Sequence, residues 1–115
     1  MALDDMREYL AVLEQQGLLR RVAEEVDPEW EIGCMAKWMF QALPEHERFG
    51  LLFDKVSGSD MKVATAALGA STRAYATALG VEPDEINAKW VDALCNPVAP
   101  RQVDDGPCQE GVSDG

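Results

Sequence analysis

Residues 51–65, LLFDKVSGSDMKVAT, constrain the fold of this chain more than any other stretch. Two apolar runs rich in β-forming residues flank the polar corner SGSD, in which Gly58 tolerates a positive φ and the serine and aspartate side chains satisfy turn amides. This pattern predicts a hairpin at the centre of any sheet that the chain forms. A phosphate-binding loop needs more than one glycine and usually a helix directly behind it, so the corner is interpreted as a structural turn.

The stretch before the hairpin begins with a capped helix and a short strand. Asp5 is the expected N-cap of the helix, Glu8 reaches back to it as in a capping box, and Gly17 follows the last turn. Residues 18–23 then predict a strand at an edge of the sheet, because their alternation of apolar and polar residues is imperfect.

A second helix is predicted from the N-cap Asp27 to about Leu43, and its apolar residues fall on two faces. One stripe consists of Ile32, Met35, Ala36, Met39 and Leu43; the other consists of Trp30, Cys34 and Trp38. A single packed layer buries only the first stripe. The second stripe either covers a local loop or lies half exposed, or it forms an interface with another subunit or domain, where aromatic residues are enriched.

Two more helices follow the hairpin. Ser71 is the expected cap of a helix over residues 71–79 that Gly80 closes, and its narrow apolar face consists of Ala74, Tyr75, Ala78 and Leu79. Pro83 begins another helix that Asn96 and Pro97 end, with one face formed by Ile86, Trp90 and Leu94. The whole pattern predicts an α+β fold, with a small mixed sheet of about three strands packed with about four helices, and an extended C-terminal tail. We expect an α+β domain over residues 1–96 and a tail or linker over residues 97–115, which leads toward a partner or a following domain.

Composition excludes several function classes. The formal net charge of −11 argues against nucleic acid and anionic membranes as partners, because binding to phosphates requires Lys and Arg. This acidity is explained by solubility or, alternatively, by a basic partner protein. No apolar run approaches the roughly 18 residues of a membrane span, and no signal pattern precedes the first helix, so we expect a cytoplasmic protein.

No catalytic or metal-binding constellation is found in the sequence. Cys34, Cys95 and Cys108 form no CxxC pair, which makes a zinc site improbable and favours free thiols in a reducing compartment. His46 is the only histidine, and it lies among charged residues with no nucleophile beside it, so we expect it to be solvated.

Several segments together resemble the start of a UbiD-type decarboxylase, the family that depends on prenylated flavin mononucleotide. The segments that carry the resemblance are residues 6–10, 13–19, 26–29, 31–32, 51–56 with Gly58, 67–69, 78–81 and 106–110. Each motif is modestly specific, but their order and spacing extend over almost the whole chain. Trp30, Trp38 and the long polar link over residues 43–49 depart from the family pattern.

The resemblance implies an N-terminal domain that packs beside a split-barrel flavin domain in a larger oligomeric enzyme. That enzyme class removes or adds a carboxyl group on aromatic or unsaturated acids, and the cofactor is the electron sink. The prenylated FMN, divalent metal, monovalent cation and catalytic residues belong to the partner catalytic portion. No position of this chain matches those motifs, so no catalytic, cofactor-binding or metal-binding residue is predicted here.

The chain is therefore interpreted as a structural or accessory portion, or a small subunit, of a UbiD-type decarboxylase, with enzymatic activity only as part of that complex. The expected partner interface consists of Trp30, Cys34, Trp38, Pro107 and Cys108. One alternative is an independent acidic interaction module that kept the fold without an enzymatic role. Another is a small-ligand binder with a pocket behind the third helix.

Overall fold

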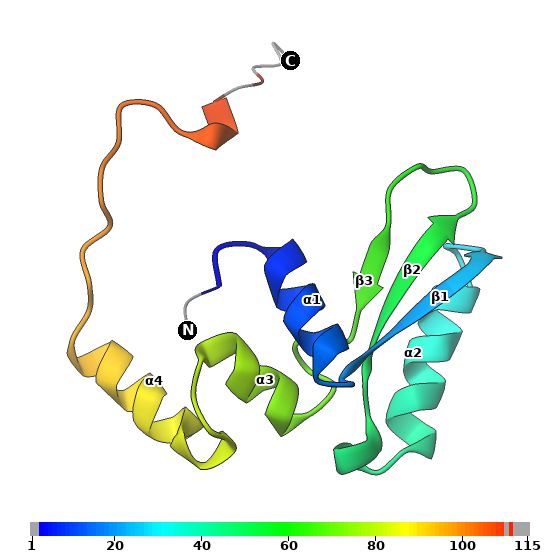
Figure 1. Ribbon diagram of the computed structural model, residues 1–115, viewed down its shortest axis with the longest axis horizontal. Helices are drawn as coiled ribbons and strands as arrows, with labels where there is room; N and C mark the ends of the chain where they lie inside the picture. Colours follow the sequence, from blue (N-terminus) through cyan, green and yellow to red (C-terminus); the bar gives the residue numbers. More distant parts are fainter. Residues whose placement is uncertain (1–2, 110, 112–115) are drawn as a thin grey trace.

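The computed structural model describes residues 3–109 and 111. The elements in chain order are α1 (Met6–Gln15), β1 (Leu19–Val26), α2 (Glu31–Ala42), η1 (Glu45–Glu47), β2 (Gly50–Val56), β3 (Val63–Thr65), α3 (Thr72–Leu79), η2 (Pro83–Glu85), α4 (Ile86–Cys95) and η3 (Pro107–Gln109), where η marks a 3₁₀ turn. The α+β class, the three-stranded mixed sheet, the four α-helices and the extended tail are confirmed for the described residues (Figure 1).

The predicted hairpin supplies the central strand β2 and the edge strand β3 of the sheet. The strand order is β1-β2-β3, with β1 parallel and β3 antiparallel to β2. At the corner, the amide of Ser59 donates to the carbonyl of Val56 at 3.1 Å, and Gly58 has a φ of +78°, which favours glycine. The corner is thus a structural turn, as predicted.

Burial on both faces of β2 organises the two layers of the domain. Because successive side chains of a strand point to opposite faces, Leu51 and Phe53 join one apolar cluster with Met39 of α2. Leu52 joins the other cluster, which contains Leu13 of α1 and Ala74 of α3. The sheet is therefore enclosed between α2 on one face and α1 with α3 on the other, as Figure 1 shows.

The edge strand β1 is longer than predicted. The sequence pattern placed a strand over residues 18–23, but pairing with β2 continues to Val26, after a shift of register between Val22 and Glu25. Glu24 and Glu25 hid this extension from the sequence pattern, because they break the run of apolar residues. An edge strand tolerates such polar side chains at its exposed positions. At its start the strand runs close to Gly50, where a Cβ atom would lie 2.9 Å from Leu19 Cδ1.

The helix caps are largely as predicted, with two corrections. Asp5 accepts a hydrogen bond from the amide of Glu8 at 2.8 Å, but the carboxylate of Glu8 bonds the amide of Asp4 instead of that of Asp5. Asp27 accepts from the amide of Glu29 at 2.9 Å in a preceding turn, and regular helix begins only at Glu31. The sequence pattern therefore predicted the first residues of α1 and α2 to within a few positions.

The helix α3 joins the body through small residues and one buried phenol. Its predicted cap Ser71 and its left-handed closing residue Gly80 are confirmed. Its fully buried positions are Ala74 and Ala76, whereas the predicted face did not include Ala76. The Tyr9 hydroxyl lies 2.9 Å from the carbonyl of Ala74 and ties α1 to α3, while its burial raises the pKa of this phenol.

The segment after α4 leaves the body of the domain. We call residues 97–109 and 111 the arm; apart from η3, it has no regular secondary structure. The radius of gyration is 17.1 Å, against about 13 Å for a compact chain of this length. The difference arises because the arm runs away from α4 without folding back onto the sheet (Figure 1).

We expect Met39→Ala to lower the free energy of unfolding by about 2–5 kcal/mol, because Met39 is 0% exposed and its truncation leaves a cavity between α2 and β2. Urea denaturation followed by circular dichroism measures this change. The matched control is Met61→Ala, a 76% exposed methionine, for which the change is expected to stay within about 0.5 kcal/mol. Equal losses for the two variants would contradict this assignment of the core.

Candidate functional site

The second apolar stripe of α2 lies uncovered on the outside of the domain. Trp30 is 71% and Trp38 is 57% exposed, and Cys34 between them is also exposed. We call these three residues the Trp face. Trp30 lies immediately before α2, and Cys34 and Trp38 lie within it. In the other predicted stripe Met39 is fully buried, Ile32 and Leu43 are partly buried against the core, and Met35 is exposed.

A hollow lies beside the C-terminal half of this face. It has a volume of about 390 Å³ and is lined by Cys34, Lys37, Trp38, Gln41 and Ala42. Lys37 forms no ion pair within residues 3–109 and 111. The hollow therefore combines an aromatic wall with a cation that has no partner in this part of the chain.

The other predicted interface residues lie elsewhere. Pro107 and Cys108 belong to η3 in the arm and are exposed. Figure 1 shows η3 well apart from α2, so the structure does not bring these two residues to the Trp face. The last residue of the resemblance, Glu110, lies outside the described residues.

A further uncovered surface runs along α4, which contains no buried residue. The indole Nε1–H of Trp90 donates to the hydroxyl of Tyr75 at 3.0 Å, which links α4 to α3. Val91 and Leu94 are exposed, and Val98 continues this apolar surface into the arm. The spacing of Ile86, Trp90 and Leu94 predicted an apolar face, but local spacing does not reveal how little of that face the body covers.

An ion-pair cluster lies on the sheet face that α1 only partly covers. Arg21 bonds Glu14 at 3.0 Å and Asp54 at 2.9 Å, and Lys62 bonds Asp54 at 3.1 Å. Hydrogen bonding and charge from Arg21 lower the pKa of Glu14, and the same two carboxylates raise the pKa of Arg21. For Asp54, partial desolvation raises the pKa, but Lys62 and Arg21 together outweigh it and the net shift is downward.

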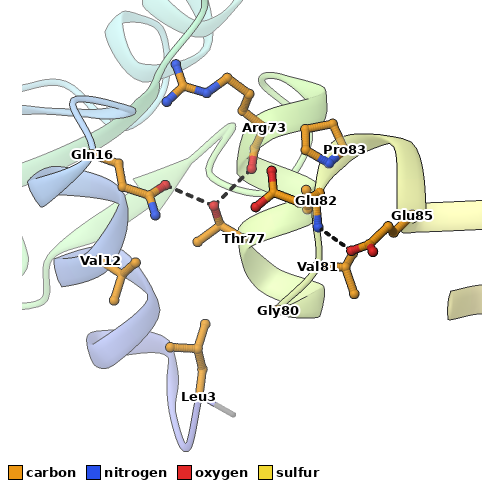
Figure 2. A pocket seen from close by; sticks show the side chains of 11 residues that line it. Leu3, Val12, Gln16, Arg73, Thr77, Gly80, Val81, Glu82, Pro83 and Glu85 are labelled. Carbon is orange, nitrogen blue, oxygen red and sulfur yellow. Dashed lines mark hydrogen bonds between the residues drawn. The ribbon is translucent and has the colours of Figure 1, made fainter. Parts of the chain in front are cut away.

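An open cleft of about 600 Å³ separates α1 from α3 and η2. Figure 2 shows Leu3 and Val12 on the α1 side, and Thr77 on the α3 side directed toward Gln16. The Thr77 hydroxyl lies 2.9 Å from Gln16 Oε1 and can donate its proton there. The cleft lies beside α3, where the small-ligand alternative expects a pocket, and its lining mixes apolar and polar groups.

The cleft does not suit the phosphate of a flavin mononucleotide. Arg73 is the one cationic residue among those that line it, and Glu82 and Glu85 line it as well. A dianionic phosphate is bound by convergent cations and backbone amides, and two carboxylates oppose it. The residues of this cleft therefore do not fit the cofactor, and no chemical step is assigned to them.

The remaining predictions from the sequence concern His46, a metal site and a membrane span. His46 is exposed in η1, 3.8 Å from a carboxylate oxygen of Glu47, which agrees with a solvated side chain. Among the described residues, no three His, Cys, Asp or Glu side chains cluster closely enough to hold a metal ion. None of the helices over residues 3–109 has the length and apolar character needed to cross a membrane.

Residues 10–94 match the family described as the 3-octaprenyl-4-hydroxybenzoate carboxy-lyase N-terminal domain, UbiD_N. The chain belongs to this family. It is 35% identical to the phenolic acid decarboxylase of Sedimentibacter hydroxybenzoicus, over 96% of this chain and 24% of that protein. It is 33% identical to the phenolic acid decarboxylase of Streptomyces sp. (strain D7), over 100% of this chain and 25% of that protein.

Solved UbiD-class structures share the fold. Vanillic acid decarboxylase of Sedimentibacter hydroxybenzoicus in its closed form matches with a TM-score of 0.78 and 32% identity, over 99% of this chain and 25% of that one. HmfF of Pelotomaculum thermopropionicum in complex with prFMN matches with a TM-score of 0.71 and 36% identity, over 84% of this chain and 21% of that one. The chain thus spans about a quarter of the length of the curated relatives it matches.

We expect Arg21→Gln to destabilise the domain at neutral pH and to have little effect in acid. The lowered folded-state pKa values of Glu14 and Asp54 contribute stability above their ordinary values of 4.5 and 3.8. That contribution is lost as the pH falls through the lowered values, because both carboxylates are then protonated. Thermal unfolding between neutral and acidic pH measures the difference between wild type and variant.

The matched control is Arg101→Gln in the arm, since Arg101 forms no ion pair within the described residues. Its stability difference from wild type is expected to be small at every pH. A difference for Arg21→Gln that stays constant down to the lowest pH would show that the cluster does not act through these two carboxylates.

Proposed function

We propose that this chain acts as the accessory N-terminal portion, or small subunit, of a UbiD-type decarboxylase for aromatic or unsaturated carboxylic acids. Its catalytic partner supplies prenylated FMN, a divalent metal, a monovalent cation and the catalytic residues. The chain itself contributes structure: the body over residues 1–96 presents a docking segment over residues 97–115. Membership of the UbiD_N family and similarity to two phenolic acid decarboxylases support this proposal.

The observation that carries the proposal is the similarity to vanillic acid decarboxylase over 99% of this chain. A match of that extent includes residues after α4, which supports a counterpart of the arm in the solved protein. Within this chain the arm lacks cover, and its Val98 is almost fully exposed. An uncovered apolar segment is typical of a surface that contacts another domain or subunit.

The surface of α4 extends the proposed contact. Val91 and Leu94 point away from the body and continue into the arm, and Leu94 is 75% exposed. Pro107 and Cys108 lie further along the same segment. We therefore assign the outer side of α4 and the arm to the catalytic partner.

The test is co-purification of this chain with the catalytic portion of a UbiD-type decarboxylase that lacks its own N-terminal domain. We expect a stable complex whose flavin absorbance remains with the catalytic portion. Leu94→Asp combined with Val98→Asp is expected to reduce the co-purified amount at least about tenfold, since it places charges in the contact. Met61→Asp, on the β2–β3 hairpin, is the control and is expected to bind like wild type.

Failure of the two proteins to co-purify would overturn the proposed role and favour an independent acidic interaction module. Flavin absorbance from this chain alone would overturn the assignment of the cofactor to the partner. Wild-type binding by the doubly substituted variant would remove α4 and the arm from the interface.

A further inference from the structure

A groove of about 860 Å³ lies over the sheet between α1 and the β2–β3 hairpin, which Figure 1 shows next to each other. Its volume falls in the range of ligand-binding pockets, roughly 300–1,000 Å³. It is separate from the Trp face, because α2 covers the opposite face of the sheet. Its lining contains no residue of α4 or of the arm, so the surfaces assigned to the catalytic partner do not include it.

The floor of the groove is a row of side chains across the sheet. Arg21, Leu52 and Ala64 are register partners on β1, β2 and β3, and the side chains of such partners lie on the same face. Leu52 is buried against α1 and α3, whereas Ala64 on the edge strand is exposed. The helix layer therefore ends before β3, and the short side chain of Ala64 leaves the space above it open.

Two methionines line the walls on either side of this floor. Met6 and Leu10, four residues apart on α1, line one wall, and Met61 before β3 lines the other. Met6 is 62% and Met61 is 76% exposed, so both side chains offer apolar surface to a ligand. Because methionine is unbranched and polarizable, these walls adapt to apolar bodies of different shapes, aromatic or aliphatic.

One cation of the groove has no opposite charge beside it. Three basic side chains line the groove, and two of them are paired: Arg21 with Glu14 and Asp54, and Lys62 with Asp54. Arg7 forms no ion pair within the part of the chain that the structure describes. The guanidinium of Arg7 is therefore the charged group of this groove that is available to a ligand.

The two carboxylates that line the groove are already engaged. Asp5 accepts from the amide of Glu8 as the N-cap of α1, where the helix dipole stabilises its charge, and Glu14 accepts two hydrogen bonds from Arg21. The net charge of −11 disfavours an anion at long range, but charges more than about 8 Å away are largely screened at physiological ionic strength. Arg7 therefore sets the local preference, which is for a single negative charge.

We propose that this groove binds a monocarboxylate with an apolar body, of the size of a bicyclic aromatic or medium-chain acid. The apolar body lies over Leu52 and Ala64, between Met6 and Met61. The carboxylate accepts hydrogen bonds from Arg7, whose planar guanidinium matches the geometry of a carboxylate. The inference goes beyond the proposed function and does not depend on it, because the site consists of residues of this chain and involves no chemical step.

NMR titration of the full chain, labelled with ¹³C at the methionine methyl groups, tests the proposal. The probes are 2-naphthoate for an aromatic body and octanoate for an aliphatic body, each added up to about 5 mM, above the expected dissociation constant of roughly 0.1–1 mM. We expect saturable shifts of the Met6 and Met61 signals with at least one probe, and the comparison of the two probes identifies the kind of body. The signals of Met35 and Met39 on α2 are internal controls and are expected to stay unchanged, since α2 lies on the other face of the sheet.

Substitution of Arg7 tests the role of the charge. Arg7→Gln is expected to weaken binding of the carboxylate at least about fivefold, because it removes the charge-assisted hydrogen bonds. It is expected to have little effect on the neutral alcohol with the same body, 2-naphthylmethanol or octanol. The matched control is Arg73→Gln, which removes the cation of the cleft between α1 and α3 and is expected to bind the carboxylate like wild type.

Substitution of Ala64 tests the position of the apolar body. Ala64→Phe places an aromatic ring on the floor of the groove and is expected to abolish the shifts at Met6 and Met61. Phenylalanine is favoured in strands and Ala64 is exposed, so we expect the variant to fold, which circular dichroism verifies. If it does not fold, Arg7→Gln decides the outcome alone.

Four outcomes would overturn the inference. Neither probe causes saturable shifts; the Met35 and Met39 signals move as much as those of Met6 and Met61; the alcohol binds as tightly as the carboxylate; or Arg73→Gln weakens binding and Arg7→Gln does not, which places the anion in the cleft beside α3. None of these results affects co-purification with the catalytic portion, so failure of this inference is distinguishable from failure of the proposed function.

Discussion

Burial of β2 on both faces is the constraint on which the rest of this structure depends. Leu51 and Phe53 need cover on one side and Leu52 needs it on the other, so the chain must provide a helix layer on each face. The parallel pairing of β1 with β2 provides one of these layers. Two parallel strands need a crossover connection, and α2 is the crossover helix that covers one face. The positions of α1 and α3 follow from the second face.

This arrangement leaves different surfaces free on the two sides of the domain. α2 covers the sheet with one stripe, so its other stripe faces outward from the described residues. α4 lies beyond α3 and buries none of its residues, and its contact through Trp90 and Tyr75 is an exposed hydrogen bond. The uncovered apolar surfaces of the described residues are therefore the faces that remain when the sheet has been covered.

Local sequence rules predicted the elements well because caps and turns depend on neighbouring residues. Asp5, Ser71, Gly58 and Gly80 each act as expected. The predictions were wrong where contacts between residues far apart in the sequence determine the structure. Strand β1 pairs with β2 through charged residues as far as Val26. Ala76 is buried by packing that the pattern of its own helix does not reveal. The Trp face was predicted from spacing alone, whereas the cluster around Arg21 joins residues far apart in the sequence and carries no local signal.

The separation of core and arm has a consequence for the thermodynamics of assembly. Every buried side chain among the described residues precedes α4, so covalent continuity beyond the arm adds nothing to the core. In a single polypeptide, docking of the arm is intramolecular and benefits from an effective concentration in about the millimolar range. In two separate chains, the same contacts must also compensate for the translational freedom lost on association. Identical surfaces would therefore form a permanent junction within one polypeptide, but a concentration-dependent complex between two chains.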